Sequence, residues 1–323
     1  MTRILILGGG GMVGQKLAHR IATVGPQGHA KPDVTLFDMA FPPQSAAGSQ
    51  ITGNLTDGET LRSLASKRFD IIFHLAAVVS GEAEKDFDKG WAVNMMSMWT
   101  LLEALRHEHT VSDGAYIPRI VFTSSIAVFG APYPDKINDT FLSAPQTSYG
   151  AQKAICEVML SDFSRKGFVD GISLRLPTIC VRPGKPNLAA SSFFSGIIRE
   201  PLNGLEAILP VPDTVRHWHA SPRAAAGFLC HAATLDTALL AGRRALNLPG
   251  LSCTVAEQIE ALRRVGGEEV VQRIKPRPDP DIMRIVEGWP RDFQPDRALE
   301  LGFKAESSFD EIIETYIADD LTG

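Results

Sequence analysis

Tyr149 and Lys153 are the residues of this sequence whose types and spacing point most directly to proton transfer. They lie four positions apart in residues 147–161, a segment that predicts a helix beginning near Ser148, so both side chains would share one helix face. A free tyrosine has a pKa of about 10, and a neighbouring ammonium group favours its phenolate because opposite charge stabilises the ionised form. On these two residues alone, a half-buried tyrosine beside a solvated lysine is the simpler interpretation. The residues expected to be buried in this helix are Ala154, Ile155, Val158 and Met159.

A glycine-rich turn near the start of the chain points to a nucleotide. It follows a predicted strand at residues 3–7, precedes a helical pattern, and satisfies two spacings, Gly9-x-Gly11-x-x-Gly14 and Gly8-x-x-Gly11-x-x-Gly14. Strand, glycine turn and helix form the dinucleotide-binding fingerprint, in which the backbone approaches a pyrophosphate that sits on the N–H groups of the helix start. A glycine turn without a ligand is the alternative.

Asp38 follows the next predicted strand, residues 34–37. A carboxylate at this place accepts hydrogen bonds from the hydroxyls of the adenosine ribose. It would repel a 2′-phosphate, and no Arg or Lys follows immediately, so the sequence favours NAD over NADP. An ordinary turn residue at a strand end is the alternative.

Strands and helices continue to alternate through the first half of the chain. Strands are predicted at 70–77 and 120–125, with a long helix at 82–107 between them. Ala76 and Ala77 stand at the carboxyl end of the first of these strands, where ligands of parallel sheets bind. Asn94 falls inside the long helix, where asparagine is unfavourable and needs a polar partner if it is buried.

This alternation predicts an α/β fold of the Rossmann type, with a doubly wound parallel sheet. We expect residues 1–176 to form the NAD-binding domain that carries the catalytic residues. Residues 177–323 are expected to form a smaller α/β part that mainly binds substrate, with some segments returning to the first domain.

Composition excludes several other classes of protein. Hydrophobic residues make up 44% and charged residues 21% of the 323 positions, and the formal net charge is -5. The Lys and Arg residues are scattered, which argues against nucleic-acid binding, and the four cysteines are too far apart for a zinc site or a disulfide framework. No apolar stretch suits a signal peptide or a membrane span, so we expect a cytoplasmic protein.

Taken together, the motifs resemble the extended branch of the short-chain dehydrogenase/reductase family. The resemblance rests on their order and mutual spacing. They are the glycine turn, Asp38, His74-Leu75-Ala76-Ala77, Asn94, residues 123–130, Tyr149-x-x-x-Lys153, Arg175-Leu176-Pro177-Thr178 and residues 217–221.

The resemblance implies a role for each residue of the site. Tyr149 would accept or donate the proton, and Lys153 would lower its pKa and bind the nicotinamide ribose. Ser125 would hydrogen-bond the reacting hydroxyl or carbonyl, and Asn94 would support the site. The reaction is then hydride transfer from a carbinol carbon to NAD, which needs no metal. The cofactor-binding residues would be Gly8, Gly11, Met12, Val13, Gly14, Asp38, Asn54, Leu55, Leu75, Ala76, Ala77, Asn94, Tyr149, Lys153 and Pro177.

The second half of the chain carries the features that bear on substrate. Arg182 lies in a loop of turn formers at 180–187, which also contains Lys185, and a helix is predicted at 188–198. A small anionic substrate would fit such a helix start, with Arg182 as a clamp for its carboxylate. A solvated loop cation is the alternative for Arg182.

Further along, His217 or Arg216 is expected to face the substrate from a strand at 215–219. Two helices, at 254–264 and 308–318, around a strand near Val270 are expected to form a lid over the cofactor-binding part.

Residues 175–187 resemble the branch of the family that uses NAD to oxidise the 2-hydroxyl of a four-carbon sugar acid, D-erythronate. A nucleotide-sugar 4-epimerase or reductase is the alternative, since it would use Ser125, Tyr149 and Lys153 in the same way. A regulator that senses NAD without turnover is a further alternative. A dehydratase is disfavoured because no acidic pair follows Ser124.

The helices predicted at 82–107 and 148–166 carry more apolar residues than one core-facing stripe requires. We therefore expect a homodimer built from these helices.

Overall fold

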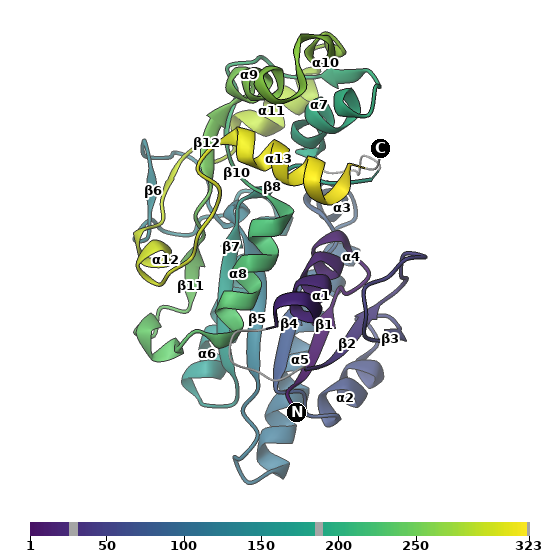
Figure 1. The fold of residues 1–323 in the computed structure, drawn as a ribbon. Helices are drawn as coiled ribbons and strands as arrows, with labels where there is room; N and C mark the ends of the chain where they lie inside the picture. The colour runs from purple at the N-terminus through teal and green to yellow at the C-terminus, as the bar shows by residue number, and fades with distance from the viewer. Residues whose placement is uncertain (26–31, 185–189, 322–323) are drawn as a thin grey trace.

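The computed structural model describes residues 1–25, 32–184 and 190–321. Within them, seven parallel strands form the central sheet, with helices on both faces (Figure 1). In spatial order the strands are β11 (Ala245–Asn247), β7 (Asp170–Leu176), β5 (Arg119–Ser125), β4 (Ile71–His74), β1 (Arg3–Leu7), β2 (Asp33–Asp38) and β3 (Ser49–Thr52). The strand order reverses between β1 and β4, which is where ligands bind in such sheets. The predicted fold class is confirmed.

Residues of the central strands are buried on both faces, which explains why their sequences are continuous apolar runs. In β1, Ile4 and Ile6 belong to the core on one face, whereas Leu5 and Leu7 belong to the core on the other. The first face is covered by α1 (Met12–Val24), α8 (Pro222–Thr234) and α12 (Asp296–Glu300). The second face is covered by α2 (Gly58–Ser66), α5 (Ser97–Val111) and α6 (Ser148–Arg165).

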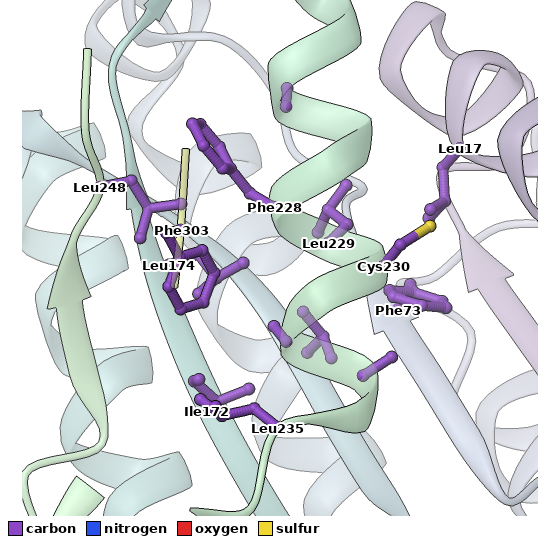
Figure 2. Packing of buried hydrophobic residues seen from close by; sticks show 14 of the residues in the cluster. Leu17, Phe73, Ile172, Leu174, Phe228, Leu229, Cys230, Leu235, Leu248 and Phe303 are labelled. Carbon is purple, nitrogen blue, oxygen red and sulfur yellow. The ribbon is translucent and has the colours of Figure 1, made fainter. Parts of the chain in front are cut away.

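Helix α8 lies beyond residue 176 and still packs on the central sheet. Figure 2 shows Phe228 and Leu229 of α8 beside Leu174 of β7, with Cys230 directed toward Leu17 of α1. Strand β11, from the same half of the chain, pairs with β7 at the sheet edge. The seven-stranded central sheet and its helical cover are therefore completed by segments from the second half of the chain.

The long helix predicted at 82–107 is wrong as a single element. The chain instead forms α3 (Ser80–Lys85), α4 (Phe87–Trp91), the π-helical segment η1 (Ala92–Met96) and then α5. The break lies at Asp86, whose backbone leaves the helical region and whose carboxylate caps α4 by accepting from the N–H of Lys89. Asn94 lies in the π-helical segment, a type of irregularity that is frequent at functional sites.

The start of helix α6 is confirmed: Thr147 is its N-cap, and its hydroxyl accepts from the N–H of Gly150. The predicted buried face is wrong. Ile155 and Val158 are 37% and 71% exposed, and Ala154 and Met159 are half-buried. The residues of α6 that face the core instead are Gln152, Lys153, Cys156, Glu157, Leu160, Phe163 and Ser164. Apolar periodicity misleads here because this helix turns polar side chains toward the sheet.

A third core joins the elements of the C-terminal part, which lies at the top of Figure 1. Its helices are α7 (Ser192–Leu202), α9 (Val255–Gly266), α10 (Glu268–Val271), α11 (Pro280–Glu287) and α13 (Phe309–Asp320). Its strands are β8 (Thr178–Ile179), β9 (Ala207–Leu209), β10 (Arg216–Ala220), β12 (Leu251–Thr254) and β13 (Ile274–Pro276). The strand predicted near Val270 is wrong, because this residue lies in α10 and the strand follows it. The helix predicted at 188–198 begins at Ser192 in the described part of the chain.

Short elements connect these two parts. Strand β6 (Ile137–Asn138) pairs with β14 (Phe293–Gln294), and single turns form η2 (Ile126–Val128) and η3 (Thr237–Leu240). No helix of the described residues is both long and apolar enough to cross a bilayer.

Candidate active site

A cavity of about 280 Å³ opens beyond the carboxyl ends of β4, β5 and β7. The sheet register aligns these ends, with Leu7 beside His74 and Ser125 beside Leu176. The predicted site residues that line the cavity are Val13, Leu75, Ala77, Ser125, Tyr149, Lys153, Pro177, Arg182 and His217. Strand ends, α6 and the segment after β7 therefore bring together residues that are far apart in the sequence.

Lys153 is 2% exposed and lies against β5. Its Nζ donates to the carbonyl oxygen of Thr123 at 2.7 Å and lies 4.7 Å from the centroid of the Phe122 ring and 5.5 Å from that of Tyr149. Burial lowers the pKa of Lys153 from 10.5 to about 8, although Cys156 and Glu157 act in the opposite direction. The structure thus holds a cation one helical turn from Tyr149.

Tyr149 shows how burial competes with charge. Burial raises its pKa to about 12, while the positive charge of Arg182 and a hydrogen bond with Ser125 act to lower it. Burial is the larger effect, so the phenol is protonated at neutral pH in the protein alone. The sequence assigned the cation that lowers the pKa of Tyr149 to Lys153; in the structure the charge of Arg182 has this effect.

A buried ion pair lies one helical turn after Lys153 on α6. Arg175 of β7 pairs with Glu157 of α6 through Nη2 and Oε2 at 2.7 Å, and Ser124 Oγ donates to the other oxygen of Glu157 at 2.5 Å. Glu157 is 6% exposed, so both charges are largely removed from water. The pair ties α6 to β7, and the hydrogen bond from Ser124 ties Glu157 to β5 as well.

Asn94 has the polar partners that a buried asparagine requires. Its amide oxygen accepts from the N–H of Val78 at 2.8 Å, and its amide nitrogen donates to the carbonyl of Val78 at 3.2 Å and to Gln152 Oε1 at 2.8 Å. Asn94 does not line the cavity itself, but Val79 and Ser80, which follow Val78, do. In the structure it ties the loop after β4 to α6.

The glycine turn and Asp38 lie next to each other. The carboxylate of Asp38 accepts from the N–H groups of Gly10 at 2.9 Å and Met39 at 2.7 Å. A β-carbon at Gly8 would lie 2.7 Å from the backbone nitrogen of Ala76, and one at Gly14 would lie 2.2 Å from the carbonyl oxygen of Gly8. These glycines are therefore required for close packing between the turn, the start of α1 and the end of β4.

Asn54 and Leu55, two of the predicted cofactor-binding residues, have partners within the protein. The side-chain oxygen of Asn54 accepts from the N–H of Thr56 at 3.0 Å, and Leu55 is 7% exposed within the core covered by α2 and α5. A contact of this turn with adenine would therefore use its backbone.

Arg182 and His217 form part of the cavity wall on the side of the C-terminal part. Both ring nitrogens of His217 are already occupied, one by Thr178 Oγ1 at 2.7 Å and one by the carbonyl oxygen of Pro290 at 2.9 Å. Burial lowers the pKa of His217 to about 4, so the ring is neutral. It holds Thr178, which lines the cavity, rather than offering a free nitrogen to a ligand. Lys185 lies outside the described residues.

Several further residues that line the cavity have no signal in the sequence. Ser80 follows β4, Tyr133 comes from the loop after η2, and Trp289 follows α11. The hydroxyl of Tyr133 donates to the carbonyl oxygen of Gly288 at 3.0 Å, and the Trp289 ring lies 5.1 Å from that of His217. Only folding places residues 288–290 over the cavity, since no motif marks them.

Comparison with known proteins places this geometry in a family. Residues 4–234 match the model of the NAD dependent epimerase/dehydratase family. The chain belongs to this family. The extended short-chain dehydrogenase/reductase resemblance of its motifs is thereby confirmed.

Relatives within the epimerase/dehydratase family cover the whole chain. A D-erythronate dehydrogenase of Cupriavidus necator is 46% identical over 98% of each chain, and one of Haemophilus influenzae is 40% identical over 99% of this chain and 100% of its own. A crystal structure described as the nucleoside-diphosphate-sugar epimerase from Agrobacterium tumefaciens has a TM-score of 0.94 and 54% identity, covering 98% of this chain and 94% of that one. The predicted class, an NAD-dependent oxidoreductase acting on CH–OH groups, is confirmed.

The residues present fit the NAD(H) cofactor of this epimerase/dehydratase family. Gly11 is the N-cap of α1, and no side chain caps this helix start. A β-carbon at Gly11 would project into open space, and its nearest neighbour would be the carbonyl oxygen of Gly8 at 3.4 Å. Met12, Val13 and Gly14 begin α1, whose first turn contains no acidic residue. Such a helix start binds a pyrophosphate. Lys153 Nζ bonds one acceptor among the described residues, which leaves two of its three donors for a ribose.

Two glycine variants test this arrangement. Gly11→Ala should fold normally, because residue 11 has φ -73° and the new methyl group meets nothing closer than 3.4 Å, but the methyl would obstruct the pyrophosphate. We expect its NADH affinity to fall about tenfold or more, as measured by fluorescence titration. Gly14→Ala should instead lose about 2 kcal/mol or more of stability through overpacking against Gly8. Equal NADH affinity for Gly11→Ala and wild type would contradict the assignment.

The buried charge of Lys153 predicts a pH-dependent stability. Its pKa of about 8 in the folded protein lies below its ordinary value of 10.5, so the folded state binds fewer protons than the unfolded state between these values. The stability of wild type should rise by about 3 kcal/mol relative to Lys153→Met as pH increases from 8 to 10.5. Urea unfolding across this range measures the difference. Lys166→Met, at the exposed end of α6, is the control and should show no such trend. A constant difference for Lys153→Met would contradict the prediction.

Proposed function

We propose that this chain is an NAD-dependent dehydrogenase that oxidises the 2-hydroxyl of D-erythronate to 2-dehydro-D-erythronate. The observation that carries the proposal is the composition of the cavity, which joins Ser125, Tyr149 and Lys153 to Arg182. No acidic side chain is among the described residues that line it. Such a wall suits a small anion that carries hydroxyl groups, and two full-length relatives are named D-erythronate dehydrogenases.

In this proposal each polar group of the cavity has a defined role. Ser125 and Tyr149 hydrogen-bond the reacting hydroxyl, and Tyr149 takes its proton as hydride leaves the carbon. Lys153 binds the nicotinamide ribose, and the positive charge of Arg182 offsets part of the rise in the pKa of Tyr149 caused by burial. Arg182 pairs with the substrate carboxylate, for which its planar guanidinium is suited. Bound NAD supplies the hydride acceptor and a further positive charge.

Asp38 supports a preference for NAD over NADP. Its carboxylate stands at the end of β2 beside the glycine turn, where it would repel a 2′-phosphate and accept from the ribose hydroxyls. The next residue is the exposed Met39, which offers no positive charge.

We further propose that residues 1–176 bind NAD and carry the catalytic groups, while residues 177–323 mainly recognise substrate. Arg182 and Trp289 support this division because both line the cavity from the second part. Helices α8 and α12 and strand β11 are segments of that part that complete the first.

A nucleotide-sugar epimerase is the second candidate. It is favoured by the description of the Agrobacterium tumefaciens structure, and it would use the same Ser125, Tyr149 and Lys153. The volume of the cavity, about 280 Å³ with residues 288–290 in its lining, favours a smaller substrate. A regulator without turnover is disfavoured because both Tyr149 and Lys153 are present.

An absorbance assay for NADH separates these candidates. We expect wild type to reduce NAD with D-erythronate and to act far more slowly on erythritol, which lacks the carboxylate. Tyr149→Phe should lose about 100-fold or more in kcat, the usual size of a general-base contribution, while NADH binding persists. An epimerase would interconvert nucleotide sugars without net NADH. Absence of NAD reduction with every four-carbon and five-carbon sugar acid would contradict the proposal.

We also propose a homodimer formed through η1, α5 and α6. Met96, Trp99, Ile155 and Val158 are apolar yet 49%, 43%, 37% and 71% exposed, and they stand on helices that contact each other. A two-fold contact would bury these residues against their own copies. Sedimentation at micromolar concentration should show a dimer for wild type and a monomer for Val158→Glu. Leu205→Glu, at an equally apolar exposed position after α7, should remain dimeric. A monomeric wild type would refute this assembly.

A further inference from the structure

One face of helix α7 holds the backbone of Arg182. The N–H of Arg182 donates to Ser195 Oγ at 3.0 Å, and its carbonyl oxygen accepts from Arg199 Nη1 at 2.7 Å. Ser195 and Arg199 are four residues apart, so they share a face of the helix. The side-chain Nε of Arg182 donates to the carbonyl oxygen of Ile179 at 3.0 Å. The N–H, the carbonyl oxygen and the side-chain Nε of Arg182 are therefore all held by hydrogen bonds. These bonds fix the residue at the cavity that it lines.

Ser195 and Arg199 are polar residues inside an apolar core. They are 2% and 5% exposed, and their neighbours on α7, Phe194 and Ile198, are fully buried. Taking a guanidinium out of water costs several kcal/mol, and a well-packed apolar residue often stabilises a fold as well or better. Arg199 Nη2 pairs with Glu200 Oε1 at 2.5 Å, which offsets part of that cost. Packing alone gives no reason for an arginine here, whereas holding the Arg182 peptide does.

Arg199 also contributes charge. Burial is the main cause that lowers the pKa of Arg182, and the positive charge of Arg199 lowers it further. The electrostatic repulsion between the two guanidinium groups decreases when an anion binds between or beside them. An uncharged ligand gives no such relief, so the pair favours carboxylates over their neutral analogues.

We propose that Ser195 and Arg199 are positioning residues that hold Arg182 toward the substrate cavity, so that helix α7 sets the preference for substrates bearing a carboxylate. The inference rests on the proposed function, in which Arg182 binds that carboxylate. Ser195 and Arg199 act through Arg182 and touch neither substrate nor cofactor.

The test compares D-erythronate with its uncharged amide, D-erythronamide, as the ratio of their kcat/KM values with NAD. Arg182→Ala should lower this ratio about 100-fold. Ser195→Ala should lower it about tenfold, the size expected for one hydrogen bond to the clamp, and Arg199→Met at least as much. Arg199→Lys keeps the charge and one donor and should recover part of the preference. The losses should appear in KM for the acid, with KM for NAD unchanged.

A double-mutant cycle separates positioning from a general loss of structure. In an Arg182→Ala background, Ser195→Ala and Arg199→Met should change the ratio by less than about twofold, because they act through the missing side chain. Asn203→Ala is the matched control: it removes bonds to the Arg199 carbonyl and to the Tyr316 hydroxyl at the far end of α7. It should lower thermal stability and leave the ratio unchanged.

Three outcomes would overturn the inference: additive losses in the cycle, equal losses for acid and amide, or a loss in Asn203→Ala as large as in Ser195→Ala. If wild type prefers the acid and the α7 variants keep that preference, the inference fails alone. If wild type turns over neither compound, the proposed function fails and the inference falls with it.

Discussion

Burial of the Lys153 ammonium group against the end of β5 is the interaction on which the rest of the site depends. The group reaches the Thr123 carbonyl only if α6 turns a polar face to the sheet, and that face also carries Gln152 and Glu157. Each of these needs a partner from another element, because an unpaired polar group in a protein core is costly. Asn94 of η1 binds Gln152, and Arg175 of β7 binds Glu157.

The same constraint explains why structure around the cavity departs from regular patterns. The π-helical segment places Asn94 where it reaches both Gln152 and Val78, and so it joins α6 to the loop after β4. Arg175 extends the network to Asn247 of β11 at 3.2 Å, a residue from the far half of the chain. Burial of the Lys153 charge reduces the stability of the protein alone, and in the proposed reaction this charge binds the cofactor. Such local cost for activity is common at enzyme sites.

Much of the fold and of the cofactor side could be predicted from the sequence. The glycine turn, Asp38 and the apolar strands are local patterns whose meaning depends on neighbours within about 40 residues, and the structure places them together at the strand ends. The buried face of α6 could not be predicted, because apolar periodicity assumes an apolar core and this helix faces a polar network. The break at Asp86 was missed because residues 82–85 contain no large apolar side chain, so apolar periodicity carries no information on that side of Asp86.

The sequence by itself determined the doubly wound sheet, the family, and the residues Ser125, Tyr149 and Lys153 as candidates, because each rests on short-range spacing and strand order. Only the tertiary structure decided what stands opposite them. Arg182 acts on Tyr149, His217 has both nitrogens occupied, and Trp289 covers the cavity. The contacts of Arg182 with Tyr149 and of His217 with Thr178 and Pro290 join residues 33, 39 and 73 positions apart. No local pattern encodes such pairs, since they follow from the packing of the C-terminal part on the ends of the strands.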